Sequence, residues 1–213
     1  MTQKCRFTFQ MESFSFLTIE KPAEGFYKEL GSKFLAYAFP VSSKSDVKAN
    51  LEALRKKHFD ATHHCYAWVL GADKARHRAN DDGEPNHSAG DPILGQIRAK
   101  NLTNVLVVVV RYFGGTKLGV GGLIQAYKAA AEEVLTQAVI IEKQVTVTLG
   151  LSFGYETTPE VMRLIKDFDM QIISQEFAEA CLINLEVNKR NYDGFIAKVN
   201  LMNALGHRIN IDS

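Results

Sequence analysis

The chain has 213 residues, of which 46% are hydrophobic and 23% are charged, as expected for a globular protein of one large domain or two small ones. The net charge of +1 argues against a general polyanion binder. Residues 1–140 carry 18 Lys and Arg against 14 Asp and Glu (+4), whereas residues 141–213 carry 7 against 10 (−3). This asymmetry permits a basic face on the first half. The three cysteines, Cys5, Cys65 and Cys181, lie far apart and predict reduced thiols, not a disulfide framework.

The first elements of the chain follow from local patterns. Residues 1–24 are predicted to form an N-terminal arm. Larger and smaller side chains alternate over residues 31–39, which predicts a strand that ends at Pro40. Residues 45–57 predict an amphipathic helix, because its apolar positions fall on one face and its basic residues lie at the negative end of the helix dipole. Ser45 is the expected N-cap of this helix.

Strand and helix signals continue to the middle of the chain. Residues 63–70 predict a second strand, whose side chains point alternately to opposite faces. The polar segment 72–91 is too long for a simple turn, and loops of this length inside compact domains are often functional. A short helix is expected after Pro92, and the β-branched run 105–110 predicts a central strand covered on both faces. A further helix is predicted at residues 122–138.

Residues 141–213 are predicted to form a separate unit. A strand at residues 145–151 is followed by a helix that starts at Thr158, where the next residue is a proline suited to the first helical position. A β-hairpin over residues 170–187, a helix over residues 192–205 and a short strand over residues 209–211 complete a βαββαβ order, the ferredoxin-like plan. The predicted fold class is therefore α+β, with two domains.

A glycine-rich loop follows the central strand and is the densest chemical feature of the sequence. Its glycines are Gly114, Gly115, Gly119, Gly121 and Gly122. Their amides and the helix start beyond them could cradle a phosphate or a nucleic-acid backbone, with Arg111, Tyr112 and Lys117 beside them. The spacing matches neither a Walker A loop nor a dinucleotide fingerprint. Because glycine supplies positive φ angles in either case, close packing of strand, turn and helix stays an equal alternative.

Acidic and histidine-rich segments suggest a possible metal site or catalytic site. Asp81, Asp82 and Glu84 could hold a hard cation, but the alternate spacing of a calcium loop is absent, so a turn-ordering role is favoured. His64 lies on the opposite strand face from His63 and Cys65, and two ligands are too few for zinc. We therefore expect no metal and no cofactor, and no catalytic residue is identified.

Aromatic residues could stack nucleic-acid bases on an exposed sheet face. The candidates are Tyr66, Trp68, Tyr112 and Phe113. For Trp68 its place in the middle of a strand favours core packing instead.

The order of these motifs resembles the signature of the Impact/YigZ family. The matching segments are Ser32-Lys33-Phe34, His63-His64-Cys65, Asp81-Asp82-Gly83-Glu84-Pro85, Ala89-Gly90, and Val107 to Val110 followed by Arg111-Tyr112-Phe113-Gly114-Gly115, Leu118-Gly119 and Gly121-Gly122-Leu123. The resemblance covers residues 25–140 densely, and the tail from about residue 143 is similar to the small C-terminal domain of the bacterial members.

The resemblance implies a fold and a setting for function. Residues 25–140 would form an Impact-type domain similar to ribosomal protein S5 domain 2, and residues 141–213 a ferredoxin-like domain similar to the last domain of translocation elongation factors. The eukaryotic relatives are translational regulators that bind the activator of a stress-response kinase, but they carry an extra recognition domain, so that partner does not carry over. The family has no agreed catalytic residues, and fold analogy is only an associational argument for function.

Three hypotheses follow from the sequence. The first is a non-catalytic regulator that binds RNA, the ribosome or a translation-associated protein through the glycine-rich loop. The second is an enzyme acting on a phosphorylated or nucleotide-like molecule, with Asp81, Asp82, Glu84, His63 and His64 completing the site. The third is a protein-interaction module. No membrane-spanning run or signal-peptide core is apparent, so the expected location is the cytoplasm, and the oligomeric state stays open.

Overall fold

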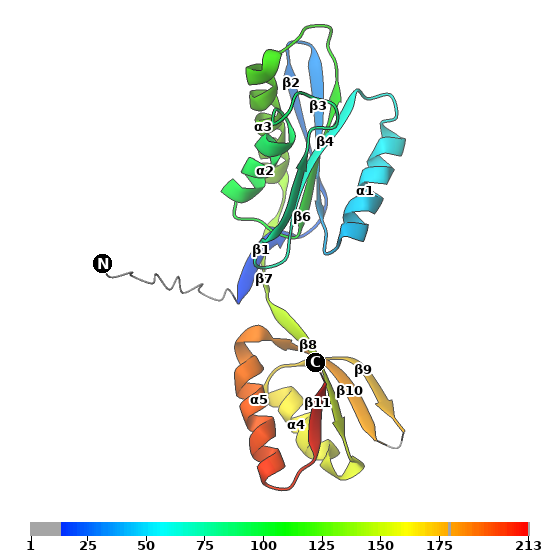
Figure 1. Ribbon diagram of the computed structural model, residues 1–213, viewed down its shortest axis with the longest axis vertical. Coiled ribbons are helices and arrows are strands. Elements are labelled where there is room, and N and C mark those ends of the chain that lie inside the picture. Colours follow the sequence, from blue (N-terminus) through cyan, green and yellow to red (C-terminus); the bar gives the residue numbers. More distant parts are fainter. Residues whose placement is uncertain (1–13, 179, 213) are drawn as a thin grey trace, which may run out of the picture. The chain divides into compact units, whose positions relative to one another are not determined.

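The computed structural model describes residues 14–178 and 180–212, which form two compact units (Figure 1). The first unit runs from Phe16 to Lys143, and the second is built mainly from Gln144 onward. Each unit contains both helices and sheet strands, and the prediction of an α+β fold with two domains is confirmed. Within the described residues, no helix combines the length and apolar character needed to cross a membrane.

A five-stranded antiparallel sheet forms the centre of the first unit. Its spatial order is β2-β3-β6-β4-β5. The strands are β2 (Ala23–Glu29), β3 (Ser32–Pro40), β4 (His63–Leu70), β5 (Arg76–Asn80) and β6 (Val105–Tyr112). A separate two-stranded sheet pairs β1 (Ser15–Ile19) with β7 (Ile140–Gln144).

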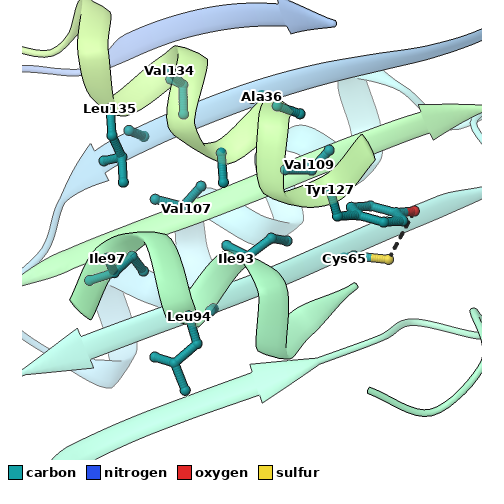
Figure 2. Close-up of a cluster of buried hydrophobic side chains, with 14 of the residues drawn as sticks. Ala36, Cys65, Ile93, Leu94, Ile97, Val107, Val109, Tyr127, Val134 and Leu135 are labelled. Carbon is teal, nitrogen blue, oxygen red and sulfur yellow. Dashed lines mark hydrogen bonds between the residues drawn. The ribbon is translucent and has the colours of Figure 1, made fainter. Parts of the chain in front are cut away.

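Helices cover both faces of the five-stranded sheet (Figure 1). On one face lie α2 (Gly90–Ala99) and α3 (Gly119–Gln137), and on the other lies α1 (Lys44–Lys57). Figure 2 shows the first core, where Ile93 of α2 and Val134 of α3 pack over Val107 and Val109 of β6. Leu106 and Val108 of β6 belong to the core beneath α1. The continuous apolar run of β6 is therefore buried on both faces, as its composition predicts.

The structure corrects several predicted boundaries. Residues 1–13 of the predicted arm lie outside the described residues, but residues 15–19 form β1, and β2 begins before residue 24. The predicted loop 72–91 contains the edge strand β5, whose charged residues hide the strand pattern. Both α2 and α3 begin a few residues earlier than predicted.

The N-cap of α1 is Ser43, not the predicted Ser45. The Ser43 side chain accepts a hydrogen bond from the amide of Asp46, and the Asp46 carboxylate accepts one from the amide of Ser43. This reciprocal capping box needs an acidic residue three positions after the cap, which Ser45 lacks.

The second unit has the predicted βαββαβ order. Its sheet is antiparallel, in the order β11-β8-β10-β9, with two helices over one face. The elements are β8 (Thr146–Phe153), a short 3-10 helix (Tyr155–Thr157), α4 (Thr158–Asp167), β9 (Gln171–Phe177), β10 (Cys181–Asn188), α5 (Lys189–Ala204) and β11 (Ile209–Asp212). Its buried cluster includes Leu149, Leu185 and Phe195 and is separate from the cores of the first unit.

Candidate functional site

The residues singled out in the sequence gather at one end of the first unit. There β6 ends, β4 begins, and the register pairs Arg111 with His63 on one side and with Phe34 on the other. The segment after β5 is attached to this same end because Asp82 accepts a hydrogen bond from the His64 amide, Glu84 accepts one from Arg111, and the Asp81 carbonyl oxygen accepts one from Cys65. The acidic segment and the start of the glycine-rich loop therefore do come together.

A buried ion pair joins these two segments. Arg111 Nη1 lies 2.6 Å from Glu84 Oε1, and the two side chains are only 7% and 4% exposed. Tyr127 of α3 donates a hydrogen bond to the same Glu84 oxygen at 2.8 Å. The guanidinium of Arg111, predicted to bind an anionic ligand, thus pairs inside the protein with Glu84, a partner distant in sequence.

The other two carboxylates order the loop that leads into α2. Asp81 accepts hydrogen bonds from the amides of His87, Ala89 and Gly90 at 2.8–3.0 Å, so it covers the first amides of α2. Asp82 accepts one from the amide of His64 at 2.7 Å and pairs with Arg55 at 3.2 Å. These bonds favour the turn-ordering role over the metal role.

The histidines and the cysteine of β4 support the same loop. His63 Nδ1 lies 2.8 Å from the carbonyl oxygen of Asp82, and Cys65 Sγ donates to the carbonyl oxygen of Asp81 at 2.9 Å. Burial raises the pKa of the Cys65 thiol well above its ordinary value, so the thiolate needed for nucleophilic chemistry does not form near neutral pH. Burial also lowers the pKa of His64, with Asp82 opposing that shift.

Metal binding gains no support from these side chains. In the part of the chain that the structure describes, no three His, Cys, Asp or Glu residues lie close enough together to hold a metal ion.

The glycines of the loop fall into two groups. A Cβ atom on Gly114 would lie 1.9 Å from the carbonyl carbon of Gly31, so close backbone contact requires glycine there. Gly115 and Gly119 have positive φ angles of 88° and 69°. By contrast, a Cβ atom on Gly121 would meet nothing within 4 Å. Close packing of the strand, the turn and the helix thus explains why residue 114 is a glycine, but it does not explain why residue 121 is one.

The loop itself is open to solvent and carries one cation. Lys117 is exposed, as is Gly121, whereas Gly122 is partly buried. No side chain caps the N-terminus of α3, which begins directly after Leu118. The predicted combination of a lysine with free helix amides is present here, without the contribution expected from Arg111.

A groove beside this loop contains residues that the sequence did not single out. We call it the aromatic groove; it has a volume of about 450 Å³ and is lined by Phe26, Lys28, Gly31, Lys33, Leu35, His58, Tyr112 and Phe113. Phe26 and Phe113 are 50% and 49% exposed. Lys28 and Lys33 are exposed, and neither forms an ion pair with any described residue. The groove thus offers the two exposed rings of Phe26 and Phe113 and two ammonium groups without an ion-pair partner, of which Lys28 Nζ lies over the Phe26 ring at 5.4 Å from its centroid.

A hydrogen-bonded chain forms the end wall of the aromatic groove. His58 Nε2 lies 2.8 Å from the hydroxyl of Tyr37, and its Nδ1 lies 3.0 Å from the hydroxyl of Tyr112, which donates to Asp60. Burial, reinforced by the neighbouring charge of Lys57, lowers the pKa of His58. Partial burial and the bond to Asp60 raise the pKa of Tyr112. The side chains of His58 and Tyr112 are therefore uncharged near pH 7, and their hydrogen bonds fix the Tyr112 ring.

The predicted base-stacking residues are only partly available. Tyr66 and Trp68 are buried beneath α1, so core packing holds for Trp68 and stacking is ruled out for both. Phe113 is open as predicted. The missed residue Phe26 could have been found from its alternation with Lys28, which places both on one face of β2.

Comparisons with known proteins place these features in a family. A family model described as the Impact N-terminal domain matches residues 30–135. "IMPACT family member YigZ" of Escherichia coli (strain K12) is 32% identical over 170 residues, which cover 79% of this chain and 83% of that protein. "Protein IMPACT" of Mus musculus is 39% identical over 93 residues, 41% of this chain and 29% of the mouse protein.

A solved structure is similar over both units. A crystal structure of a hypothetical protein covers 95% of this chain and 98% of its own, with 28% identity and a TM-score of 0.74.

Proposed function

The chain belongs to the Impact family, and we propose that it is a non-catalytic regulator that binds RNA, the ribosome or a translation-associated factor through its first unit. The observation that carries this proposal is the aromatic groove, where Lys28 and Lys33 stand beside the exposed rings of Phe26 and Phe113. Lysines neutralise phosphates and aromatic rings stack on bases, so this combination suits RNA.

The surroundings of the groove support a binding role. Gly31 lines the groove and contacts Gly114, so the groove adjoins the glycine-rich loop with its exposed Lys117. A phosphate beside this loop would also gain from the uncapped amides at the start of α3. The engaged carboxylates Asp81 and Glu84 favour binding over acid–base catalysis, because their oxygens already accept hydrogen bonds from the protein.

Co-sedimentation with ribosomes and with free RNA, across a salt series, tests the proposal. We expect binding that weakens steeply as salt rises and that Lys28→Ala/Lys33→Ala reduces by about tenfold or more at low salt. The matched control is Lys166→Ala/Lys198→Ala, which removes two exposed lysines from the second unit and should bind like the unmodified protein. Absence of binding to every ribosome and RNA preparation would refute RNA and the ribosome as partners, and equal binding by both variants would refute the aromatic groove as the binding surface.

A further inference from the structure

A second groove lies on the opposite side of α1 from the aromatic groove. The helix packs over β6, β4 and the middle of β3, whereas the residues of β2 and β5 that face the same side stay mostly exposed. We call this second one the basic groove; it has a volume of about 470 Å³ and is lined by Lys44, Val47, Lys48, Leu51, Glu52, Arg55, Tyr66, Trp68, His77 and Arg78. The face of the sheet that carries α1 therefore has two grooves, the basic groove along the helix and the aromatic groove beside the C-cap of the helix, His58.

The walls of the basic groove carry cations from two elements. Arg78 of β5 lines the groove and pairs in register with Trp68. Arg76 lies beside the groove and pairs with Leu70, so both arginines point to the face that carries α1. Arg76, Arg78 and Lys44 are exposed and form no ion pair with any described residue. Charges on an edge strand also prevent edge-to-edge pairing, but that function does not require a lysine on the facing helix.

The two grooves differ in what they can bind. The rings on the floor of the basic groove, Tyr66 and Trp68, are only 9% and 6% exposed and cannot stack on a ligand. This groove therefore suits phosphates alone, to which arginine binds with two parallel hydrogen bonds. In the aromatic groove, Lys28 lies over the Phe26 ring and Arg111 over the Phe113 ring, so a base would stack on the ring area that stays exposed. In a duplex the bases are already stacked and paired.

On the basis of the proposed function, we infer that the partner is an unpaired RNA segment that crosses α1, with bases stacked in the aromatic groove and backbone phosphates held by Arg78 in the basic groove and by Arg76 beside it. Substitutions in the two grooves are then expected to change the RNA affinity and its salt dependence in different ways. Phosphate contacts set the salt dependence of affinity, whereas stacking contributes affinity with little salt dependence.

Fluorescence anisotropy with a labelled 20-nucleotide uridine-rich RNA, over a salt series, separates these two effects. For Arg76→Ala/Arg78→Ala, the slope of log affinity against log salt should fall by about 1.4, since each phosphate contact to a single strand contributes about 0.7. For Phe26→Ala/Phe113→Ala, the affinity should fall about tenfold or more with an unchanged slope. Lys166→Ala/Lys198→Ala is the control, and the same RNA annealed to its complement should bind more weakly than the single strand.

The outcomes distinguish this inference from the proposed function. If the RNA binds and Lys28→Ala/Lys33→Ala weakens it, but Arg76→Ala/Arg78→Ala leaves the slope unchanged, the inferred path across α1 is wrong while the proposed function stands. Equal or tighter binding of the duplex would also overturn the inference. If neither RNA nor ribosomes bind, the inference fails, and of the proposed function only binding to a translation-associated protein factor stands. Thermal unfolding of each variant verifies that it is folded; the milder Arg76→Gln/Arg78→Gln variant serves if the alanine variant is not.

Discussion

At the scale of single residues, Glu84 links three elements through one carboxylate. Its Oε1 accepts hydrogen bonds from Arg111 of β6 and Tyr127 of α3, and all three side chains are buried. We expect Glu84→Gln to lower the free energy of unfolding by about 3 kcal/mol, because it leaves the Arg111 charge buried without a counter-ion. Urea denaturation at pH 7 measures this change.

Two further variants show whether the charge is the cause. Lys117→Ala removes an exposed cation from the same end of the unit and should change the free energy of unfolding by no more than about 0.5 kcal/mol. Arg111→Met/Glu84→Leu removes both charges and should be less destabilised than Glu84→Gln alone. A loss below about 1 kcal/mol for Glu84→Gln would mean that solvent reaches Arg111.

At the scale of elements, the glycine-rich connection between β6 and α3 has a rigid part and an open part. Gly114→Ala should destabilise the unit severely, since the added Cβ would lie 1.9 Å from the Gly31 backbone. Gly121→Ala should instead raise the free energy of unfolding by about 0.5–1 kcal/mol, because alanine favours the helix and its Cβ meets nothing. Melting temperatures of the two variants test this contrast. Destabilisation by Gly121→Ala would contradict it.

Local sequence patterns explain which elements could be predicted and which could not. Strand β4 and strand β6 were found because their apolar pattern is local and continuous. Strand β5 was missed because an exposed edge strand needs no apolar face, and the sequence Arg76-His77-Arg78 looks like a polar loop. The cap of α1 was misplaced because Ser43 and Ser45 both suit a cap, and only the Asp46 bonds choose between them.

The candidate site was harder to predict because its contacts are long-range. The place of the glycines, Lys117 and Phe113 after β6 predicts a binding role for them from sequence alone, whereas the pairing of Arg111 with Glu84 joins residues far apart in sequence and cannot be predicted in that way. Similarly, Phe26 and Lys33 reach Phe113 only through the pairing of β2 with β3 and of β3 with β6. Strand order decides which residues of different strands become neighbours, and the local periodicity of the sequence does not reveal strand order.

At the scale of the whole molecule, the described residues form separate hydrophobic cores in the two units. The cores on the two faces of the five-stranded sheet draw only on residues between Leu17 and Ala138, and the third core draws only on residues between Val147 and Ile211. A fragment of residues 14–143 should therefore fold alone and unfold in one cooperative transition. It should also bind RNA within about threefold of the full chain, because both grooves lie within it.

The complementary fragment of residues 144–213 should fold but not bind RNA. Its sequence is acidic, and the described residues on the open face of its sheet include Glu186 and Asp212 but no lysine or arginine. Circular dichroism shows whether each fragment is folded, and anisotropy with the same labelled RNA measures binding. RNA binding by residues 144–213, or its loss from a folded 14–143 fragment, would mean that the second unit supplies part of the binding surface.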